Sequence, residues 1–468
     1  MSQFGGNGRP LLRAGLLRAG VVRVGLARAG LLGAGLLGDG LLRVGLLGAG
    51  LLGAGLLRAG LLRVGLPRAG LLRAGYCGLS HVASNPANST QIWISRSHDA
   101  LLNLCVEHHL LQVTPPQSTV LIVYVNAPCV VVGRNQNPWR EADLHLLASL
   151  GKASDLVSDE APDGAPDGAP DGPPDGPSEG PREGPPEGPP DGAPDKPRLV
   201  RRRSGGGTVL HDEGNANYCV ICPSADFDRD RHAEMVVAAL HALGRRNTHV
   251  NQRHDIVMTA PDETLYKISG SAYKLTRQRA LHHGTCLLHS PSLHSMARLL
   301  DSPAKPFLVA HGVESVSSPV RNAHLTHAEF EQAVVTQFGD MYGAAKVCSE
   351  FGPETLSEPE IKAGYQELQS REWLFGQTPR FVFDTHTQQQ QPPFPQRVAF
   401  EAKHGIIERF EARGCHEADT AALLGRRLYD IDDWTSWLAR AGMDAADSTA
   451  VGAWMNRILG TRFTKIFA

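Results

Sequence analysis

Apolar residues recur with strand-like and helix-like spacing from about Gln91 onward, which marks the expected start of folded sequence. Residues 91–95 read Gln-Ile-Trp-Ile-Ser, and residues 99–107 place apolar side chains at helical intervals. Residues 120–125 and 129–132 are two β-branched runs separated by Asn-Ala-Pro. Such runs are typical of strands, and their short separation predicts a hairpin-like pair.

The later part of the chain continues this mixture of strands and helices. Residues 230–243 have an amphipathic helical pattern that ends at Gly244, a residue favoured just after a helix. The other predicted elements are strands at 255–258 and 265–268, helices at 293–300 and 328–338, and a loop at 388–395 that is rich in Gln and Pro.

The N-terminal part has a different pattern. Residues 10–75 repeat the pentapeptide Leu-Leu-Arg-Ala-Gly with variants. Five residues advance an α-helix by about 140° beyond a full turn, so the leucine pairs spread around the helix instead of forming one stripe. The apolar runs also fall short of the roughly 18 residues of a membrane span. We expect residues 1–90 to be low-complexity sequence, neither a transmembrane helix nor a folded domain.

The charge of this repeat tract indicates a targeting segment. Its charged residues are arginines apart from Asp39, and Arg-rich, acid-poor N-termini are typical of mitochondrial transit peptides. Expansion of a simple repeat accounts for its length and glycine content equally well. A mitochondrial location is therefore one of two interpretations of this tract.

A second repeat tract interrupts the folded sequence. Residues 161–195 repeat Ala-Pro-Asp-Gly with variants. A tract so rich in proline, glycine and aspartate cannot bury a core, so we predict a disordered acidic insertion over residues 152–197. The fold tolerates such an insertion because closure entropy grows slowly with loop length. A docking or regulatory role is the alternative.

Composition narrows the class of protein. The 468 residues carry a formal net charge of −2, which argues against a general nucleic-acid or membrane-surface binder. The eight cysteines are scattered without a disulfide framework, so we expect reduced thiols. Cys219 and Cys222 form a CxxC motif, but residues three apart on a strand face opposite sides, and no second ligand pair follows. This favours core thiols over a metal site.

The candidate chemistry centres on residues 201–215, which read RRRSGGGTVLHDEGN. Consecutive glycines let backbone N–H groups converge on an anion, and flanking arginines add charge and bidentate donors. The same composition is typical of a flexible loop beside a solvated or nucleic-acid-binding patch. The β-like run at residues 208–210 favours a loop held in place by a strand.

Three other motifs accompany this stretch. They are GRNQNPW at 133–139, KISGSAYK at 267–274 and HHGT at 282–285. In this order, the four motifs resemble the lipoate–protein ligase A family, which has the catalytic fold of biotin and lipoate protein ligases. The resemblance covers residues 91–468 and is broken by the acidic insertion.

This resemblance implies an α+β fold, with a mixed or antiparallel sheet of the biotin/lipoate ligase type and flanking helices. The catalytic domain would span residues 91–376, and a small α+β C-terminal accessory domain would span residues 377–468. Residues 311–322 resemble the family's adenylate-covering loop.

The resemblance also implies a reaction and its partners. A lipoate–protein ligase activates lipoate with ATP to lipoyl-AMP and transfers the lipoyl group to a lysine of a lipoyl domain. The expected acceptors are 2-oxoacid dehydrogenase E2 subunits and the glycine-cleavage H protein, and the expected location is the mitochondrial matrix, where eukaryotic members act. Because the sequence has no metal-ligand cluster, Mg²⁺ would arrive with ATP. We expect a monomer with no nucleic-acid or membrane partner.

Both reaction steps place negative charge on phosphate and carbonyl oxygens, so positioning and electrostatic stabilisation should carry the catalysis. Lys267 is the expected catalytic residue, since one ammonium can contact both the acyl carbonyl and the α-phosphate. The residues expected to bind ATP or lipoyl-AMP are Arg202, Ser204, Gly205, Gly206, Gly207, Thr208, Val209, Leu210, His211, Asp255, Lys267, Ser269 and Ala272. The residues expected in the lipoate pocket are Arg202, Gly207, His211, Lys267, His283 and Gly284, with Gly205 and Gly206 leaving room for the acyl chain.

Some neighbouring residues have a structural or solvent-exposed role as an alternative to a role in the site. His211 either positions a substrate oxygen or is a core histidine bonded to Asp212. Arg201 and Arg203 are expected to be solvated, and His282 is expected to be structural.

Three positions depart from the family pattern. His254 precedes Asp255 where asparagine is usual, Lys274 stands where arginine is common, and Ser317-Ser318 lie where an arginine occurs. These changes would affect ATP use more than acyl transfer. A lipoyltransferase that accepts lipoyl-AMP, or a lipoyl or octanoyl group on a carrier protein, is therefore the main alternative.

Three further functions have less support from the residues. An amidotransferase of this fold would use Cys286 as nucleophile, but its spacing from His283 on a strand turns the two side chains apart. A non-catalytic protein that binds lipoyl domains would have no need of Lys267. An RNA-binding protein would cluster basic and aromatic residues, which this sequence does not do.

Overall fold

The computed structural model describes residues 78–150, 196–291, 293, 297–387, 390–415, 420–461 and 463. The N-terminal repeats, nearly all of the acidic insertion, and parts of the predicted helix 293–300 and loop 388–395 lie outside these residues. The helices are α1 (Leu79–Ser84), α2 (Ala100–Val113), α3 (Pro138–Glu141), α4 (Leu144–Ser149), α5 (Arg231–Ala242), α7 (His327–Tyr342), α8 (Pro359–Gln369), α9 (Arg371–Gly376), α11 (Trp434–Arg440) and α12 (Ala445–Leu459). Helix α1 precedes Gln91, so ordered structure begins earlier than the apolar pattern indicated.

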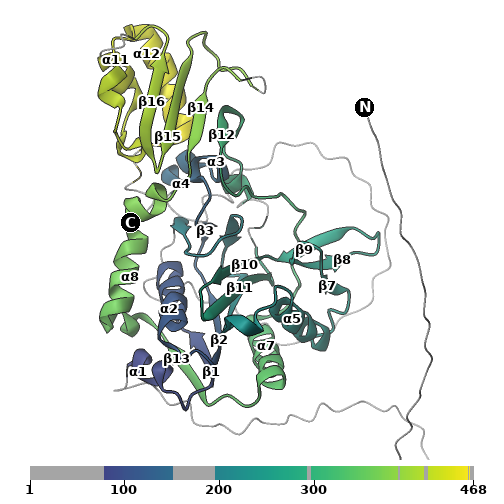
Figure 1. The fold of residues 1–468 in the computed structure, drawn as a ribbon. Coiled ribbons are helices and arrows are strands. Elements are labelled where there is room, and N and C mark those ends of the chain that lie inside the picture. The colour runs from purple at the N-terminus through teal and green to yellow at the C-terminus, as the bar shows by residue number, and fades with distance from the viewer. Residues whose placement is uncertain are drawn as a thin grey trace, which may run out of the picture. The chain divides into compact units, whose positions relative to one another are not determined.

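Within the described residues, the strands form four sheets (Figure 1). The first has six strands in the order β10 (Ser271–Leu275), β11 (Arg279–Leu287), β6 (Asn215–Pro223), β2 (Thr119–Val125), β1 (Thr90–Ser95) and β13 (Val347–Phe351). The two three-stranded sheets are β4 (Arg198–Arg201), β3 (Cys129–Val132), β5 (Val209–His211), and β7 (Thr248–Val250), β8 (Ile256–Thr259), β9 (Leu265–Ser269). The fourth sheet is β12 (Leu308–Ala310), β14 (Phe381–Asp384), β15 (Val398–Lys403) and β16 (Ile406–Ala412).

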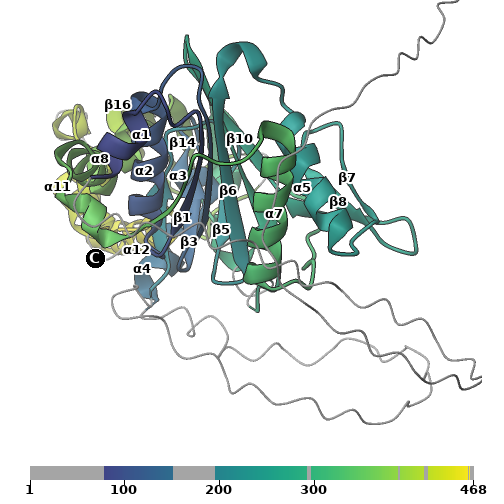
Figure 2. The ribbon, with the colours of Figure 1, turned by 90° about the horizontal axis from the view of Figure 1, so that it is seen from below.

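The six-stranded sheet is mixed and is covered on both faces. Its strand β1 pairs in parallel with β2 and β13, whereas β2, β6, β11 and β10 pair antiparallel in succession. Helices α1, α2 and α8 lie on one side of the strands, and α5 and α7 lie on the other (Figure 2). This arrangement confirms the expected α+β fold with a mixed sheet and flanking helices.

The period-two alternation of strand side chains separates the two layers of core. On β2, Val120 and Ile122 belong to the cluster that contains α2, whereas Leu121 and Val123 belong to the cluster that contains α5 and α7. Because both faces are apolar, β2 and β6 are buried along almost their whole length.

The predicted hairpin of residues 120–125 and 129–132 is wrong. Strands β2 and β3 are consecutive but pair in different sheets, since β2 lies between β1 and β6 while β3 lies between β4 and β5. The short Asn-Ala-Pro connection therefore carries the chain from one sheet to another. The strand at residues 198–201, absent from the predicted elements, supplies the parallel partner of β3.

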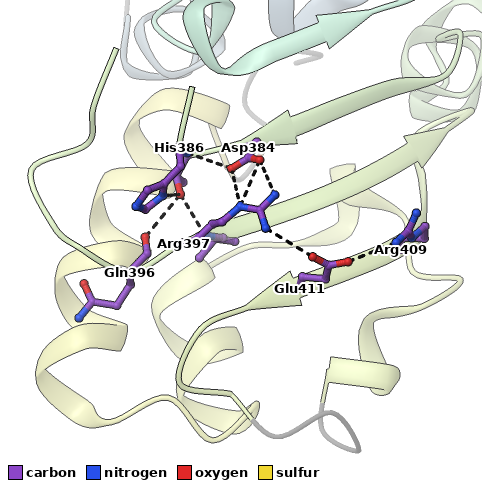
Figure 3. Close-up of polar contacts among 8 residues, drawn as sticks. Asp384, His386, Gln396, Arg397, Arg409 and Glu411 are labelled. Atoms are coloured by element: carbon purple, nitrogen blue, oxygen red, sulfur yellow. Dashed lines mark hydrogen bonds and ion pairs between the residues drawn. The ribbon is translucent and has the colours of Figure 1, made fainter. Parts of the chain in front are cut away.

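The C-terminal sheet is antiparallel and is backed by α11 and α12. Its inner face contributes phenylalanines, and Phe400 stacks on Trp434 of α11 with ring centroids 6.0 Å apart. The other face carries a row of alternating charges, in which Arg397 bonds Asp384 at 2.6 Å and also pairs with Glu411, itself paired with Arg409 (Figure 3). Exposed pairs of this kind contribute little to stability individually.

The core is continuous across residues 376–377, where the two domains were expected to meet. Trp139 packs against both Phe375 and Phe381, with ring centroids 4.9 and 5.6 Å apart.

The structure confirms the expected helices at 230–243 and 328–338 and the expected strands at 255–258 and 265–268. Among the described residues, no helix is long and apolar enough to span a membrane.

Candidate active site

The glycine-rich loop lies between β4 and β5, and hydrogen bonds from the buried side chain of Arg202 hold its backbone in place. This guanidinium is buried and donates to backbone oxygens of Gly205 at 2.6 Å, Gly207 at 2.7 Å and Val131 at 3.1 Å. Gly206 has φ +87°, a conformation that side chains rarely adopt, and a Cβ there would meet Arg202 Nη2 at 2.9 Å. The loop is thus a shaped, internally bonded turn.

Two adjoining cavities of about 190 and 480 Å³ open beside this loop. They share lining residues from β5, β9, β11 and the loop 311–322, so they form one continuous site. The predicted site residues that line one or both cavities are Arg202, Gly207, Thr208, Val209, Leu210, His211, Asp255, Lys267, Ser269, Ala272, His283 and Gly284.

Ser204, Gly205 and Gly206 are not among the lining residues. Ser204 is buried, and the carbonyl of Gly205 points to Arg202. That Gly205 and Gly206 leave room for an acyl chain stays a prediction. Gly206 also lets the loop approach Arg202 closely, whereas a Cβ at Gly205 would meet no atom within 4 Å.

Lys267 stands on β9 and lines both cavities. Its Nζ lies 3.0 Å from Asp255 Oδ1, and Arg253 Nη2 lies 3.7 Å from the other oxygen of that carboxylate. The β8–β9 register shifts between Ile256 and Val257, which places Lys267 opposite Val257. Such irregularities often re-aim a side chain at a site. On its other side, Lys267 N donates to Pro319 O at 2.8 Å, so β9 also holds the loop 311–322.

A buried chain of polar groups runs behind the smaller cavity. Arg202 Nε donates to Ser204 Oγ at 3.0 Å, and Ser204 Oγ lies 2.7 Å from His283 Nε2, to which its hydroxyl donates when the neutral ring carries its hydrogen on Nδ1. His283 Nδ1 then donates to Glu107 Oε2 at 2.9 Å, and the Tyr124 hydroxyl donates to Glu107 Oε1 at 2.8 Å. The hydrogen bonds fix the tautomer of His283 and place a buried carboxylate opposite the buried Arg202.

Glu107 and Tyr124 were missed from the sequence. Both are nearly fully buried, and both lie in segments, α2 and β2, whose pattern predicts only core. A lone glutamate inside an apolar helix pattern was the one available signal, since an unpaired buried carboxylate is costly.

His211 does not form the bond to Asp212 that the core interpretation required. Its Nδ1 accepts from Asn126 Nδ2 at 2.9 Å instead of pairing with Asp212, which accepts from Ser290 and from Gly214 N. Burial lowers the pKa of His211 to about 3, so the ring is neutral and Nε2 carries the hydrogen. That Nε2 is buried without a hydrogen-bond partner in the described structure, and the side chain lines both cavities. The Nε2–H group of His211 can therefore donate a hydrogen bond to a ligand oxygen.

The loop 311–322 is fastened to the glycine-rich loop through Ser315. The Ser315 hydroxyl accepts from Thr208 N at 2.9 Å and from Gln136 Nε2 at 3.1 Å, and it donates to Glu141. A backbone N–H of the anion-binding loop is thus occupied by a side chain of the covering loop.

The expected solvation of Arg201 and Arg203 is wrong. Arg201 is fully buried and donates to the backbone oxygens of Leu374 at 2.6 Å and of Arg134 at 2.7 Å. Burial lowers its pKa to about 9. The Arg203 side chain is only 13% exposed and bonds Glu367. A charge run in sequence does not show which members turn inward.

His254 and Cys286 lie away from the cavities. His254 has φ +63°, and its Nδ1 lies 2.6 Å from Asp230 Oδ1. Asparagine tolerates this left-handed backbone well, so the departure there is one of turn conformation. Cys286 is buried in the core that contains α5 and α7, and burial raises the pKa of its thiol, which disfavours a thiolate nucleophile.

Comparison with known proteins supports the resemblance. The family described as "Lipoyl protein ligase A/B catalytic domain" matches residues 99–153 and 194–339. A Schizosaccharomyces pombe protein, "Putative lipoate-protein ligase A", is 32% identical over 313 residues, which cover 62% of this chain and 72% of that protein. The chain belongs to the lipoate–protein ligase family.

Solved structures of this family are also similar in part. The crystal structure of P. falciparum LipL1 in complex with lipoate has a TM-score of 0.43 and 15% identity, and covers 78% of this chain and 99% of that one. A lipoate-protein ligase A bound with ATP has a TM-score of 0.39 and 18% identity, and covers 61% of this chain and 98% of that one.

Proposed function

We propose that this chain is a lipoate–protein ligase that activates lipoate with ATP to lipoyl-AMP and transfers the lipoyl group to a lysine of a lipoyl domain. The observation that carries the proposal is the place of Lys267. Its ammonium lies where the two cavities meet, beside the glycine-rich loop. A cation at that point can offset charge on the α-phosphate in the first step and on the acyl carbonyl in the second.

The other cavity groups supply complementary donors. In the first step, the carboxylate oxygen of lipoate attacks the α-phosphorus of ATP, and the bond to pyrophosphate breaks. Lys267 and Arg253, which line the smaller cavity, are the cations that would bind the phosphate oxygens. ATP would bring Mg²⁺ with it, since no cluster of three or more metal-ligating side chains occurs among the described residues.

In the second step, the acceptor lysine amine attacks the carbonyl carbon of lipoyl-AMP, and AMP leaves with the bonding electron pair. The Nε2–H of neutral His211 is a candidate donor to the developing oxyanion, alongside Lys267. We also propose the E2 subunits of 2-oxoacid dehydrogenases and the H protein of glycine cleavage as acceptors, and the mitochondrial matrix as the location.

One observation favours a transferase as the second candidate. The covering loop has Ser317 and Ser318 where the family resemblance leads us to expect an arginine, and both residues line the larger cavity. An enzyme with this loop could accept lipoyl-AMP, or a lipoyl or octanoyl group from a carrier protein, without forming the adenylate.

A comparison of donors tests both candidates. The chain is incubated with an apo-lipoyl domain and either ATP, Mg²⁺ and lipoate or preformed lipoyl-AMP, and pyrophosphate and the mass of the domain are followed. Modification in both tubes supports the ligase, whereas modification with lipoyl-AMP alone supports the transferase. If the domain stays unmodified with both donors and with a lipoylated carrier protein, the catalytic proposal fails.

A further inference from the structure

A group of basic side chains lies outside the two cavities, and nothing in the proposed reaction uses it. The basic cluster consists of Arg134, Arg203, Lys274 and His108. The guanidinium groups of Arg134 and Arg203 both stand at the ring of Trp373, 5.0 and 4.8 Å from its centroid. Lys274 Nζ donates to His108 Nδ1 at 3.3 Å. Four segments far apart in sequence therefore bring these groups together.

The basic cluster has more cations than anions. Its acidic neighbour is Glu367, which bonds Arg203 and has a side chain 49% exposed. Arg134 donates to the neutral Gln377 Oε1 at 3.2 Å. Arg203 Nε is buried without a hydrogen-bond partner in the described part of the chain.

Burial and the crowding of charge lower the pKa of two members of the cluster. Burial, followed by the charges of Arg203 and Arg134, lowers the pKa of Lys274 to about 8. Burial and Lys274 lower the pKa of His108 to about 3, so this ring is neutral. Three cations held together with Glu367 as counter-ion repel one another, and an anion bound among them would relieve that cost.

The position of the basic cluster relates it to the cavities. Lys274 follows Ala272 on the same face of β10, and two residues along a strand span about 7 Å. Ala272 lines the smaller cavity. The glycine-rich loop connects the two regions, because Arg134 N donates to Ser204 O at 2.9 Å and Gly205 N donates to Tyr273 O at 3.4 Å.

We propose that Arg134, Arg203 and Lys274 form an oxyanion site for a phosphate-class ligand, either free pyrophosphate or the terminal phosphates of bound ATP. Arginine forks match the geometry of phosphate oxygens, and the half-buried position suits a small, compact anion. Glu367 occupies Arg203 in the absence of the anion and swings into solvent when it binds. The choice of pyrophosphate rests on the proposed adenylation, which releases it.

Calorimetric titration of the full chain with sodium pyrophosphate tests this site. We expect saturable binding to the wild type and at least tenfold weaker binding to Arg203→Met and to Lys274→Met. Glu367→Gln should bind several-fold more tightly because it removes the competing carboxylate. Lys403→Met, an exposed lysine at the end of β15, serves as the matched loss of one positive charge and should bind like the wild type.

Competition identifies the source of the ligand. If ATP displaces pyrophosphate while AMP does not, the site takes the terminal phosphates, and if ATP and pyrophosphate bind together, the site is separate. The proposal is overturned if wild type shows no saturable binding at millimolar pyrophosphate, or if Arg203→Met, Lys274→Met and Glu367→Gln all bind like the wild type. Because binding is measured without lipoate or acceptor, failure of lipoyl transfer alone would contradict the proposed function and leave this site standing.

Discussion

The Nζ of Lys267 lies 3.0 Å from Asp255 Oδ1, at the wall of both cavities. The Asp255 side chain is 9% exposed and that of Lys267 is 24% exposed, so the pair is shielded from solvent but open to a ligand. Asp255 therefore holds the ammonium in place before substrate binds. A phosphate or carboxylate entering the site would compete with Asp255 for the same cation.

Removal of this ammonium should slow both reaction steps strongly. We expect Lys267→Ala to lower the rates of adenylate formation and of transfer from lipoyl-AMP by roughly 10²- to 10³-fold each, the usual loss for one oxyanion donor. Rapid-quench measurement of lipoyl-AMP formation and of acceptor modification separates the steps. Lys403→Ala is the control. A Lys267→Ala enzyme that retains either rate would remove this residue from that step.

The carboxylate of Glu107 should stabilise the fold through the buried chain that ends at Arg202. Glu107→Gln keeps the size of the side chain but removes its negative charge and leaves one acceptor oxygen, so either His283 Nδ1 or the Tyr124 hydroxyl loses its acceptor. A buried donor left without an acceptor costs about 1–3 kcal/mol, so we expect a loss of that order in the free energy of unfolding. Urea unfolding monitors it, and Glu411→Gln, in an exposed pair, should change it by less than about 1 kcal/mol. Equal effects of the two substitutions would contradict the network.

Much of the fold and part of the site follow from sequence. The helix α5, the strands β8 and β9 and the placement of Lys267 beside the glycine-rich loop were predicted, because each depends on a local pattern or on a motif. The buried partners of Arg201 were not predictable in this way, since Leu374 and Thr378 lie more than 170 residues away. Likewise, the pairing of β3 with β4 bridges the acidic insertion, and local spacing carries no information about it.

Gly284 is required by the close approach of Tyr218. A Cβ at Gly284 would lie 2.4 Å from the Tyr218 hydroxyl oxygen, and both residues are on neighbouring strands of the central sheet. We expect Gly284→Ala to destabilise the protein by about 1–3 kcal/mol, as overpacked cores do. Gly339, inside α7, has no atom within 4 Å of an added Cβ. Gly339→Ala should therefore be neutral or stabilising, by up to about 1 kcal/mol. Thermal unfolding of both variants measures these changes in stability. A Gly284→Ala protein as stable as the wild type would contradict the packing described.

Stability should fall as the pH is lowered, because several histidines are buried in the neutral form. Burial lowers the pKa of His232 to about 4, and its Nε2 bonds the Tyr342 hydroxyl at 2.7 Å. The unfolded chain binds a proton near pH 6.5 while the folded chain does not. The stability tied to this neutral ring is thus complete above pH 6.5 and is lost between pH 6.5 and 4, by up to about 1.4 kcal/mol per pH unit.

Urea unfolding at pH 7.5, 6 and 5 measures this dependence. His232→Phe should weaken the protein at pH 7.5 through the lost hydrogen bond but should flatten the decline toward pH 5. The exposed His249 provides the control, and His249→Gln should keep the wild-type slope. A His232→Phe slope equal to that of the wild type would show that His232 does not contribute.

The central claim is that this chain attaches lipoate to a lysine of another protein. The most direct measurement is the intact mass of an apo-lipoyl domain after incubation with the chain, ATP, Mg²⁺ and lipoate, beside a domain whose target lysine is replaced by arginine. We predict the mass of one lipoyl group on the first domain, none on the second, and modification of the first domain that is at least roughly 10²-fold slower with Lys267→Ala. An unmodified first domain, with lipoyl-AMP and a lipoylated carrier protein also failing as donors, would contradict the account.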